Sequence, residues 1–398
     1  MRRQRFPVPR RLWALVCGLS ILLLTGCERP PVDTVQRGYR GVGQELVVNP
    51  RILAAQEAAN VVPAPQPPAA PVPVKAISVY PDLKVLGGLT LTEFNRQMAA
   101  ISEWVAPPEQ GCAYCHNLEN MASYEKYTKT VALSMLRLTQ DTNSQWKDHV
   151  ADTGVTCWTC HRGNPVPKYV WTSEPFDDQP SGMIPTGQNR ASALVAYSSL
   201  PRDPLSAFLD RADNAISVVS QNALPTGEPG RKGIKHAEWT YGLMMHITDS
   251  LGVNCTYCHN SRAFYSWEPT RVKAWYAIRH VRKMNRDYIW PLNEVLPVSR
   301  KGPMGDPQRI TCSTCHQGVY KPLFGVSMLK DYPGLAGPIP IPAAASTPAA
   351  TPPAEVTPPQ PPMPPGASHG PDGGDPPGRI EGPEPKLTEA GGTKAGML

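Results

Sequence analysis

The sequence predicts a mainly α-helical core with little regular strand, between two proline-rich flanks. Apolar residues recur at helical spacing in the middle of the chain, whereas the alternating pattern of strands is scarce. Most of the 47 prolines lie outside this middle part. We therefore expect one folded core at residues 76–333 of the 398.

The first 26 residues have the features of a signal peptide. Arginines crowd the first eleven residues, and the apolar run that follows is shorter than the roughly 20 residues needed to cross a bilayer. The run ends in Leu24-Thr25-Gly26-Cys27, which resembles the lipobox of bacterial lipoproteins. This implies cleavage before Cys27 and acylation of its thiol. An uncleaved anchor and a signal peptide cut elsewhere are the alternatives.

Two flanking segments are predicted to lie outside the core. Residues 27–75 are rich in proline, alanine and valine without sustained periodicity, and we expect a disordered, partly extended, lipid-anchored linker. Residues 334–398 are richer still in proline, glycine and alanine, which predicts a disordered tail.

Charge is close to balanced in the mature chain. Removal of five N-terminal arginines leaves 34 basic against 33 acidic residues, which argues against a nucleic-acid partner. The sign of the net charge changes along the core. Residues 76–178 hold 8 basic and 12 acidic residues, whereas residues 179–333 hold 18 basic and 11 acidic residues.

Eight of the ten cysteines form four Cys-x-x-Cys pairs, each followed at once by histidine. With Cys17 and Cys27 near the N-terminus, no cysteine is left over for a disulfide in the core. Two thiols at this spacing reach the two vinyl groups of one haem, and the histidine becomes an axial iron ligand. Zinc is the alternative, but the other histidines lack matching spacing. The motifs predict four c-type haems: Cys112-Ala-Tyr-Cys115-His116, Cys157-Trp-Thr-Cys160-His161, Cys255-Thr-Tyr-Cys258-His259 and Cys312-Ser-Thr-Cys315-His316.

The second axial ligand decides whether each iron carries electrons or binds a substrate. Apolar helical stripes precede the first three motifs, and each includes a methionine. These are Met98, Met135 and Met244. Met121 and Met245 are rivals, although Met121 follows its motif closely and Met245 points away from the stripe.

Two details of these helices are also predicted. Thr92 is expected to cap the helix of Met98, and Tyr241 to share the apolar stripe with Met244.

The fourth motif breaks the pattern. The helix-like stretch from Arg271 to Tyr288 offers His280 and Met284, and His149 precedes the second motif. Spacing alone does not choose among these three residues.

Residues 240–260 and 312–333 carry a specific resemblance. The second stretch contains Cys-His-Gln-Gly-Val, Lys-Pro-Leu-Phe-Gly and Lys-Asp-Tyr-Pro. Together with the lipobox they resemble the tetrahaem cytochrome subunit of purple-bacterial photosynthetic reaction centres, and the likeness covers residues 76–333. The long linker and tail depart from compact members of that family, which leaves the mode of tethering open.

The resemblance implies two haem-pair modules related by a pseudo-twofold axis, with the haems in the order first, second, fourth, third. The separations between motifs fit two such modules, since motifs one and two are 45 residues apart and motifs three and four are 57 residues apart. It also implies Met98, Met135 and Met244 as ligands of the first three haems, His149 as ligand of the fourth, and Arg271 near the third haem, where it would raise the potential.

The function implied is electron transfer without catalysis. Electrons would pass from a soluble periplasmic donor, a small c-type cytochrome or a high-potential iron–sulfur protein, to the photo-oxidised bacteriochlorophyll special pair. The partners are the reaction-centre core membrane subunits, on the periplasmic face of the photosynthetic inner membrane. A multihaem nitrite or hydroxylamine enzyme, which needs an open iron, and a relay to another membrane partner are the alternatives.

Acidic residues around the first two motifs are expected to steer a basic donor toward the first haem. They are Glu93, Glu103, Glu109, Glu119, Glu125, Asp141, Asp148 and Asp152.

Overall fold

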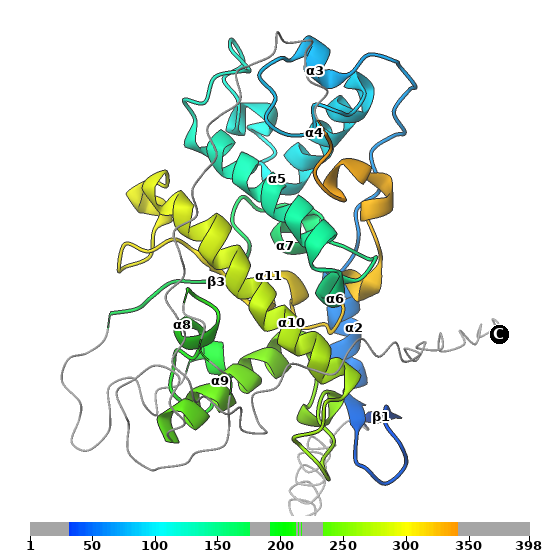
Figure 1. Cartoon of the computed structure of the whole chain (residues 1–398), viewed down its shortest axis with the longest axis vertical. Helices are drawn as coiled ribbons and strands as arrows, with labels where there is room; N and C mark the ends of the chain where they lie inside the picture. The colour runs from blue at the N-terminus through cyan, green and yellow to red at the C-terminus, as the bar shows by residue number, and fades with distance from the viewer. Residues whose placement is uncertain (1–31, 176–191, 212–213, 215, 217–233, 341–398) are drawn as a thin grey trace, which may run out of the picture.

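The computed structural model describes residues 32–175, 192–211, 214, 216 and 234–340. The predicted signal peptide, with Cys17 and Cys27, lies outside these residues, as does the chain after residue 340. Helices dominate the described part, which confirms the predicted fold class. Figure 1 shows an elongated body with α3 and α4 at one end, α5 and α10 across the middle, and α9 toward the other end.

The longer helices are α2 (Pro50–Ala59), α4 (Leu91–Val105), α5 (Tyr127–Gln145), α9 (Ile234–Leu251) and α10 (Pro269–Met284). The short ones are α3 (Ala76–Val79), α6 (Lys147–Val150), α7 (Cys157–His161), α8 (Leu205–Phe208) and α11 (Cys312–His316). Strands form two antiparallel pairs, β1 (Asp33–Gln36) with β2 (Glu45–Val48) and β3 (Val170–Trp171) with β4 (Arg309–Ile310).

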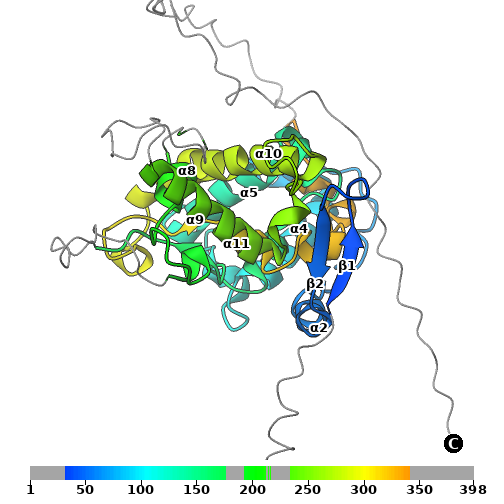
Figure 2. The same ribbon diagram turned by 90° about the horizontal axis from the view of Figure 1, so that it is seen from below.

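The N-terminal flank differs from the predicted linker because part of it is folded. Strands β1 and β2 pair from Asp33 opposite Val48 to Gln36 opposite Glu45, and α2 follows with Asn49 as its N-cap. The hairpin is held to the third motif, since Asn254 Nδ2 donates to the Glu45 carbonyl at 3.0 Å. Figure 2 shows β1, β2 and α2 together along one side of the body.

Helix α4 begins two residues earlier than predicted. Thr90, not Thr92, is its N-cap: the Thr90 hydroxyl accepts from the Glu93 N–H at 3.3 Å, and the Glu93 carboxylate accepts from the Thr90 N–H at 2.9 Å. This reciprocal pair satisfies two backbone donors that have no partner inside the helix. The Thr92 hydroxyl instead donates to the Ala70 carbonyl at 2.6 Å.

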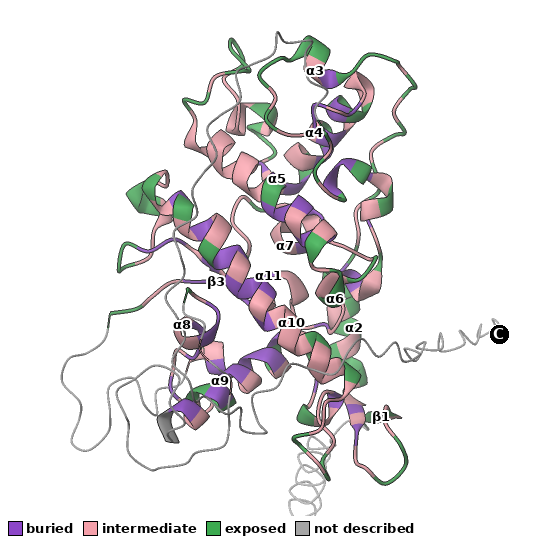
Figure 3. Ribbon diagram, in the orientation of Figure 1, coloured by how far each residue is buried: buried purple, intermediate pink, exposed green. Residues whose placement is uncertain are grey.

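Two large apolar clusters hold the body together, and a smaller third one packs Leu46 of β2 against Val253 and Tyr257. One large cluster packs α4 and Leu136 of α5 against the segment from Leu323 to Leu335, and the other packs α8, α9 and α10 around Leu243 and Ile278. Figure 3 shows buried residues along α4, α9 and α10, among residues of intermediate exposure. Tyr241 is 57% exposed, so the predicted stripe on α9 is wrong at that residue.

Ordered structure continues past the predicted boundary at residue 333. Leu335 is fully buried, and Gln140 and Asn143 of α5 donate to the carbonyls of Gly334 and Leu335 at 2.9 and 2.8 Å. The residues just after Pro333 therefore belong to the core.

Among the described residues, no helix combines the length and apolar character needed to cross a membrane.

Candidate haem-binding sites

The four cysteine motifs occupy two kinds of local structure. The first and third form 3₁₀ turns directly after α4 and α9, at Gly111–Tyr114 (η2) and Cys255–Tyr257 (η4). The second and fourth form the short helices α7 and α11. Each long helix that carries a predicted methionine ligand therefore leads toward a motif, as the sequence indicated.

Helices α7 and α11 are built alike. Thr156 and Thr311 cap them, and each exchanges hydrogen bonds with the threonine three residues later. Both end at a residue in the left-handed region, Arg162 and Gln317, each with φ 50°. The glycine that follows each one donates its N–H to the end of a long helix: Gly163 to Trp104 of α4 at 3.0 Å and Gly318 to Ser250 of α9 at 2.8 Å.

The turns η2 and η4 are also held alike. The Thr128 hydroxyl, at the start of α5, donates to the Tyr114 carbonyl at 2.6 Å. The Thr270 hydroxyl, at the start of α10, donates to the Tyr257 carbonyl at 2.8 Å. Each turn is thus fixed to the helix that follows it.

All four motif histidines bind a backbone carbonyl through Nδ1. The acceptors are Met121 for His116 (3.2 Å), Asn164 for His161 (2.9 Å), Phe264 for His259 (3.0 Å) and Val319 for His316 (2.9 Å). Burial lowers the pKa of each of these histidines, so the rings are neutral. A neutral imidazole with Nδ1 occupied presents Nε2 to a metal, the usual arrangement of a ligating histidine.

The three predicted methionine ligands lie in apolar surroundings on their helices. Met98 packs against the α4 cluster, and Met135 and Met244 pack against the α9–α10 cluster. Met121 is 48% exposed. Its carbonyl is the one that holds His116, a contact that sequence spacing did not reveal.

The three candidates for the fourth motif lie close together. His149 and His316 have ring centroids 6.2 Å apart and planes at 22°. Two imidazoles that bind one metal from opposite sides have centroids about 6 Å apart, because each metal–nitrogen bond is about 2.0–2.1 Å. His280 has both nitrogens engaged, Nδ1 with His149 Nδ1 at 2.9 Å and Nε2 with Thr142 Oγ1 at 3.0 Å. The Thr142 hydroxyl is also 3.9 Å from the sulfur of Met284.

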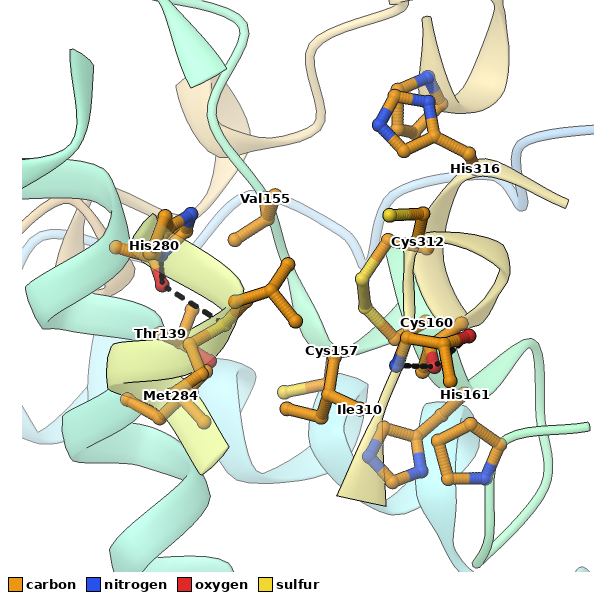
Figure 4. A pocket seen from close by; sticks show the side chains of 18 of the residues that line it. Thr139, Val155, Cys157, Cys160, His161, His280, Met284, Ile310, Cys312 and His316 are labelled. Carbon is orange, nitrogen blue, oxygen red and sulfur yellow. Dashed lines mark hydrogen bonds between the residues drawn. A yellow bond between two sulfur atoms is a disulfide. The ribbon is translucent and has the colours of Figure 1, made fainter. Parts of the chain in front are cut away.

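One continuous cavity of about 500 Å³ reaches all four motifs. It is lined by Cys115, Cys160, Cys258 and Cys315 and by apolar side chains of α5 and α10. Figure 4 shows His280, Thr139 and Met284 on one side of this cavity and His161 and His316 on the other. An apolar cavity with thiols and imidazoles at its wall suits a flat, hydrophobic, metal-bearing ring.

Burial also affects the thiols. It raises the pKa of Cys157 and of Cys312 to about 12 and that of Cys258 to about 11. These cysteines are protonated at neutral pH and line the wall of the cavity.

The second and fourth motifs lie side by side. Cys160 and Cys315 are joined by a disulfide with their Cα atoms 4.3 Å apart, and Figure 4 shows this bond. This differs from the expectation that no core cysteine pairs. Each sulfur can form either the disulfide or a thioether to haem, so a chain with haem at both motifs has these two thiols unpaired.

Arg271, at the start of α10, lies against the loop that follows the third motif. Its Nη1 donates to the carbonyls of Phe264, Tyr265 and Ser266, the first at 3.4 Å and the last at 2.9 Å. Its guanidinium also covers the ring of Trp267 at 4.3 Å. Because Phe264 also accepts from His259, Arg271 and this histidine share one carbonyl.

The donor set fits haem c: paired cysteines, a neutral histidine directly after each pair, and apolar walls. Comparison with known proteins agrees. Residues 28–336 match the family described as photosynthetic reaction centre cytochrome C subunit. The photosynthetic reaction center cytochrome c subunit of Thermochromatium tepidum is 55% identical over 325 residues, 81% of this chain and 79% of the relative.

Two further relatives carry the same name. That of Rubrivivax gelatinosus is 53% identical over 329 residues, 81% of this chain and 88% of the relative. That of Roseobacter denitrificans is 38% identical over 275 residues, 66% of this chain and 73% of the relative. The resemblance inferred from the motifs is thereby confirmed, and the chain belongs to the family of photosynthetic reaction centre cytochrome c subunits.

Proposed function

We propose that this chain holds four c-type haems and passes electrons from a soluble periplasmic donor to the photo-oxidised special pair of a reaction centre. The observation that carries the proposal is the histidine geometry, repeated at all four motifs: Nδ1 is held by a backbone carbonyl, and Nε2 is left for iron. A bound haem supplies a one-electron couple between ferric and ferrous iron. The protein supplies the ligands, their orientation and a dry environment.

The internal repeat supports two haem-pair modules. Helix α4, turn η2, α5 and α7 in one half correspond to α9, turn η4, α10 and α11 in the other. The correspondence extends to single contacts: Asn143 exchanges two hydrogen bonds with the backbone of Val155, and Asn285 exchanges two with that of Ile310. Contact between α7 and α11 fits the haem order first, second, fourth, third.

The repeat also supports a different ligand for the fourth haem. Thr128 and Asn143 on α5 have the same spacing as their counterparts Thr270, on α10, and Asn285, the first residue after α10. Met135 of α5 then corresponds to Ala277 of α10, which has no ligating atom. We therefore assign the ligands Met98, Met135 and Met244 to the first three haems.

For the fourth haem we assign His149, which reaches the second half from α6. The near-parallel rings of His149 and His316 support this assignment. His280, by contrast, has both ring nitrogens engaged by protein groups. With these four ligands each iron is six-coordinate, so the chain carries electrons and performs no catalysis.

We propose Cys27 as the lipid anchor that keeps the chain on the periplasmic face of the membrane. We also propose that the acidic residues near the first motif form the surface on which the soluble donor docks. Family membership supports association with the reaction centre and its membrane.

The proposal is tested on the purified complex. Haem should be found at four per chain, and the reduced protein should not bind carbon monoxide, since no iron is open. A flash that oxidises the special pair should be followed by oxidation of haem. Carbon monoxide binding at any haem would favour the multihaem enzyme. Intact haems that stay reduced after the flash would favour a relay to another partner.

His149 is tested separately by His149→Met. Methionine raises the reduction potential of a haem relative to a second imidazole. The potential of the fourth haem should therefore rise, and those of the other three haems should stay unchanged. Four unchanged potentials would remove His149 from the site and return Met284 to consideration.

A further inference from the structure

We propose that His280 is a positioning residue that fixes the ring of His149 and lowers the reduction potential of the fourth haem. The inference rests on the assignment of His149 as an axial ligand. It concerns a contact between two side chains, whereas the four motif histidines are all held by backbone carbonyls.

His149, His280 and Thr142 form a chain of hydrogen bonds in which each donor can be assigned. His149 Nδ1 is 2.9 Å from His280 Nδ1, and His280 Nε2 is 3.0 Å from Thr142 Oγ1. Ligation through Nε2 leaves the proton of His149 on Nδ1, so His149 donates and His280 accepts. His280 then carries its own proton on Nε2 and donates to Thr142, whose hydroxyl points to the sulfur of Met284 at 3.9 Å.

Packing holds His280 in one orientation. Its side chain is 2% exposed, and the ring stacks on Trp146 with centroids 4.8 Å apart and planes at 19°. The His149 ring meets it edge-on, at 77° and 5.2 Å between centroids. A buried ring fixed on one face by tryptophan and at one edge by threonine can aim its single lone pair only at His149.

The fold itself does not require a histidine at this position. By the spacing that relates α5 to α10, His280 corresponds to Leu138, which is a buried member of the apolar cluster. A leucine therefore serves the packing role in the other half. The polar residue is present only where a second imidazole lies beside it.

The expected effect follows from ligand basicity. An imidazole nitrogen is a stronger acceptor than an amide oxygen, so this hydrogen bond increases electron donation from His149 to iron and favours the oxidised form. It also fixes the plane of the His149 ring relative to His316, which the structure gives as 22°.

The test uses the full chain in its purified, haem-loaded complex, with redox titration and low-spin EPR as readouts. EPR reports the angle between the two axial imidazole planes. His280→Leu, which places at this position the residue type of Leu138, should raise the fourth-haem potential by an amount that corresponds to about a tenfold change in its reduction equilibrium, about 59 mV for one electron. Its EPR signal should shift as well.

Three further variants separate positioning from packing. His280→Asn puts an amide oxygen near the place of Nδ1, so its fourth-haem potential should lie closer to the wild-type value than that of His280→Leu. Thr142→Val, which frees the far edge of His280, should give a smaller shift in the same direction. Ser144→Ala is the matched control on the same helix, because its hydroxyl donates to the Gln140 carbonyl and not to His280; it should leave the fourth haem unchanged.

Two results would overturn the inference alone. One is an unchanged fourth-haem potential and EPR signal in His280→Leu, in a protein where His149→Met does move that potential. The other is an equal shift in His280→Leu and His280→Asn. If His149→Met moves no potential at all, the ligand assignment fails, and this inference fails with it.

Discussion

Replacing Arg271 with glutamine should lower the potential of the haem at the third motif and leave the other three in place. Arg271 and His259 meet at one oxygen: the Phe264 carbonyl lies 3.4 Å from Arg271 Nη1 and 3.0 Å from His259 Nδ1. A fixed cation at this distance opposes the extra positive charge of oxidised iron and so favours the reduced form. Glutamine removes the charge while keeping a hydrogen-bond donor.

The size of the effect follows from Coulomb's law. The shared carbonyl puts the guanidinium charge about 10 Å from an iron bound to His259, which gives about 1.7 kcal/mol at an effective dielectric constant of about 20 and about 0.4 kcal/mol at that of water. At about 59 mV for each tenfold change, this range corresponds to about 20–70 mV. Arg271 is half-buried, so solvent screening favours the lower half of the range, about 20–40 mV.

The assay is a redox titration of the complex followed in the haem absorption bands. Arg262→Gln is the matched control, because it removes the same charge from an exposed position in the same loop. Arg271→Lys should have a third-haem potential close to that of the wild type, since the positive charge remains. A third-haem potential that is equal in the wild type and Arg271→Gln, or that falls equally in Arg262→Gln, would refute the reasoning.

Three other predictions concern the anchor, the donor and the core. Cys27→Ser, expressed without reaction-centre subunits, should appear in the soluble periplasmic fraction, and retention in the membrane would favour an uncleaved anchor. Re-reduction after a flash should slow with rising ionic strength for a basic donor and not for a neutral one, because charge steering is screened over about 8 Å at physiological salt; equal salt dependence would exclude the acidic docking surface. Thr90→Ala should lower the free energy of unfolding by about 1 kcal/mol through loss of the α4 cap, with Thr92→Ala as control; a larger loss in the control would contradict the assigned cap.

The sequence predicted the helices well because helical spacing and haem attachment are local signals. The stripes containing Met98 and Met135 lie on α4 and α5, and the stretch that begins at Arg271 forms most of α10. The cap of α4 was misplaced by two residues because Thr90 and Thr92 are both suitable, and only the reciprocal bond with Glu93 distinguishes them. Tyr241 fits the helical period but is exposed, since periodicity does not say where a neighbouring element ends.

Long-range contacts account for what the sequence did not reveal. The β1–β2 hairpin is stabilised by Asn254, about two hundred residues away along the chain. The pair of His149 and His280 depends on how α6 packs against α10, which no spacing rule anticipates. The folded part of the N-terminal flank is not evident from composition, because residues 63–73, which are mostly proline and alanine, dominate the average over the whole flank.

The closeness of Cys160 and Cys315 bears on the order of events during biogenesis. Cys157 and Cys312 line the cavity as protonated thiols, and Cys160 and Cys315 are near enough to form a disulfide when an oxidant is present. A chain that packed before receiving its cofactors would therefore present inert sulfur to the attachment machinery, in a compartment that favours disulfides. We therefore expect haem to be attached at the second and fourth motifs while Cys160 and Cys315 are still reduced.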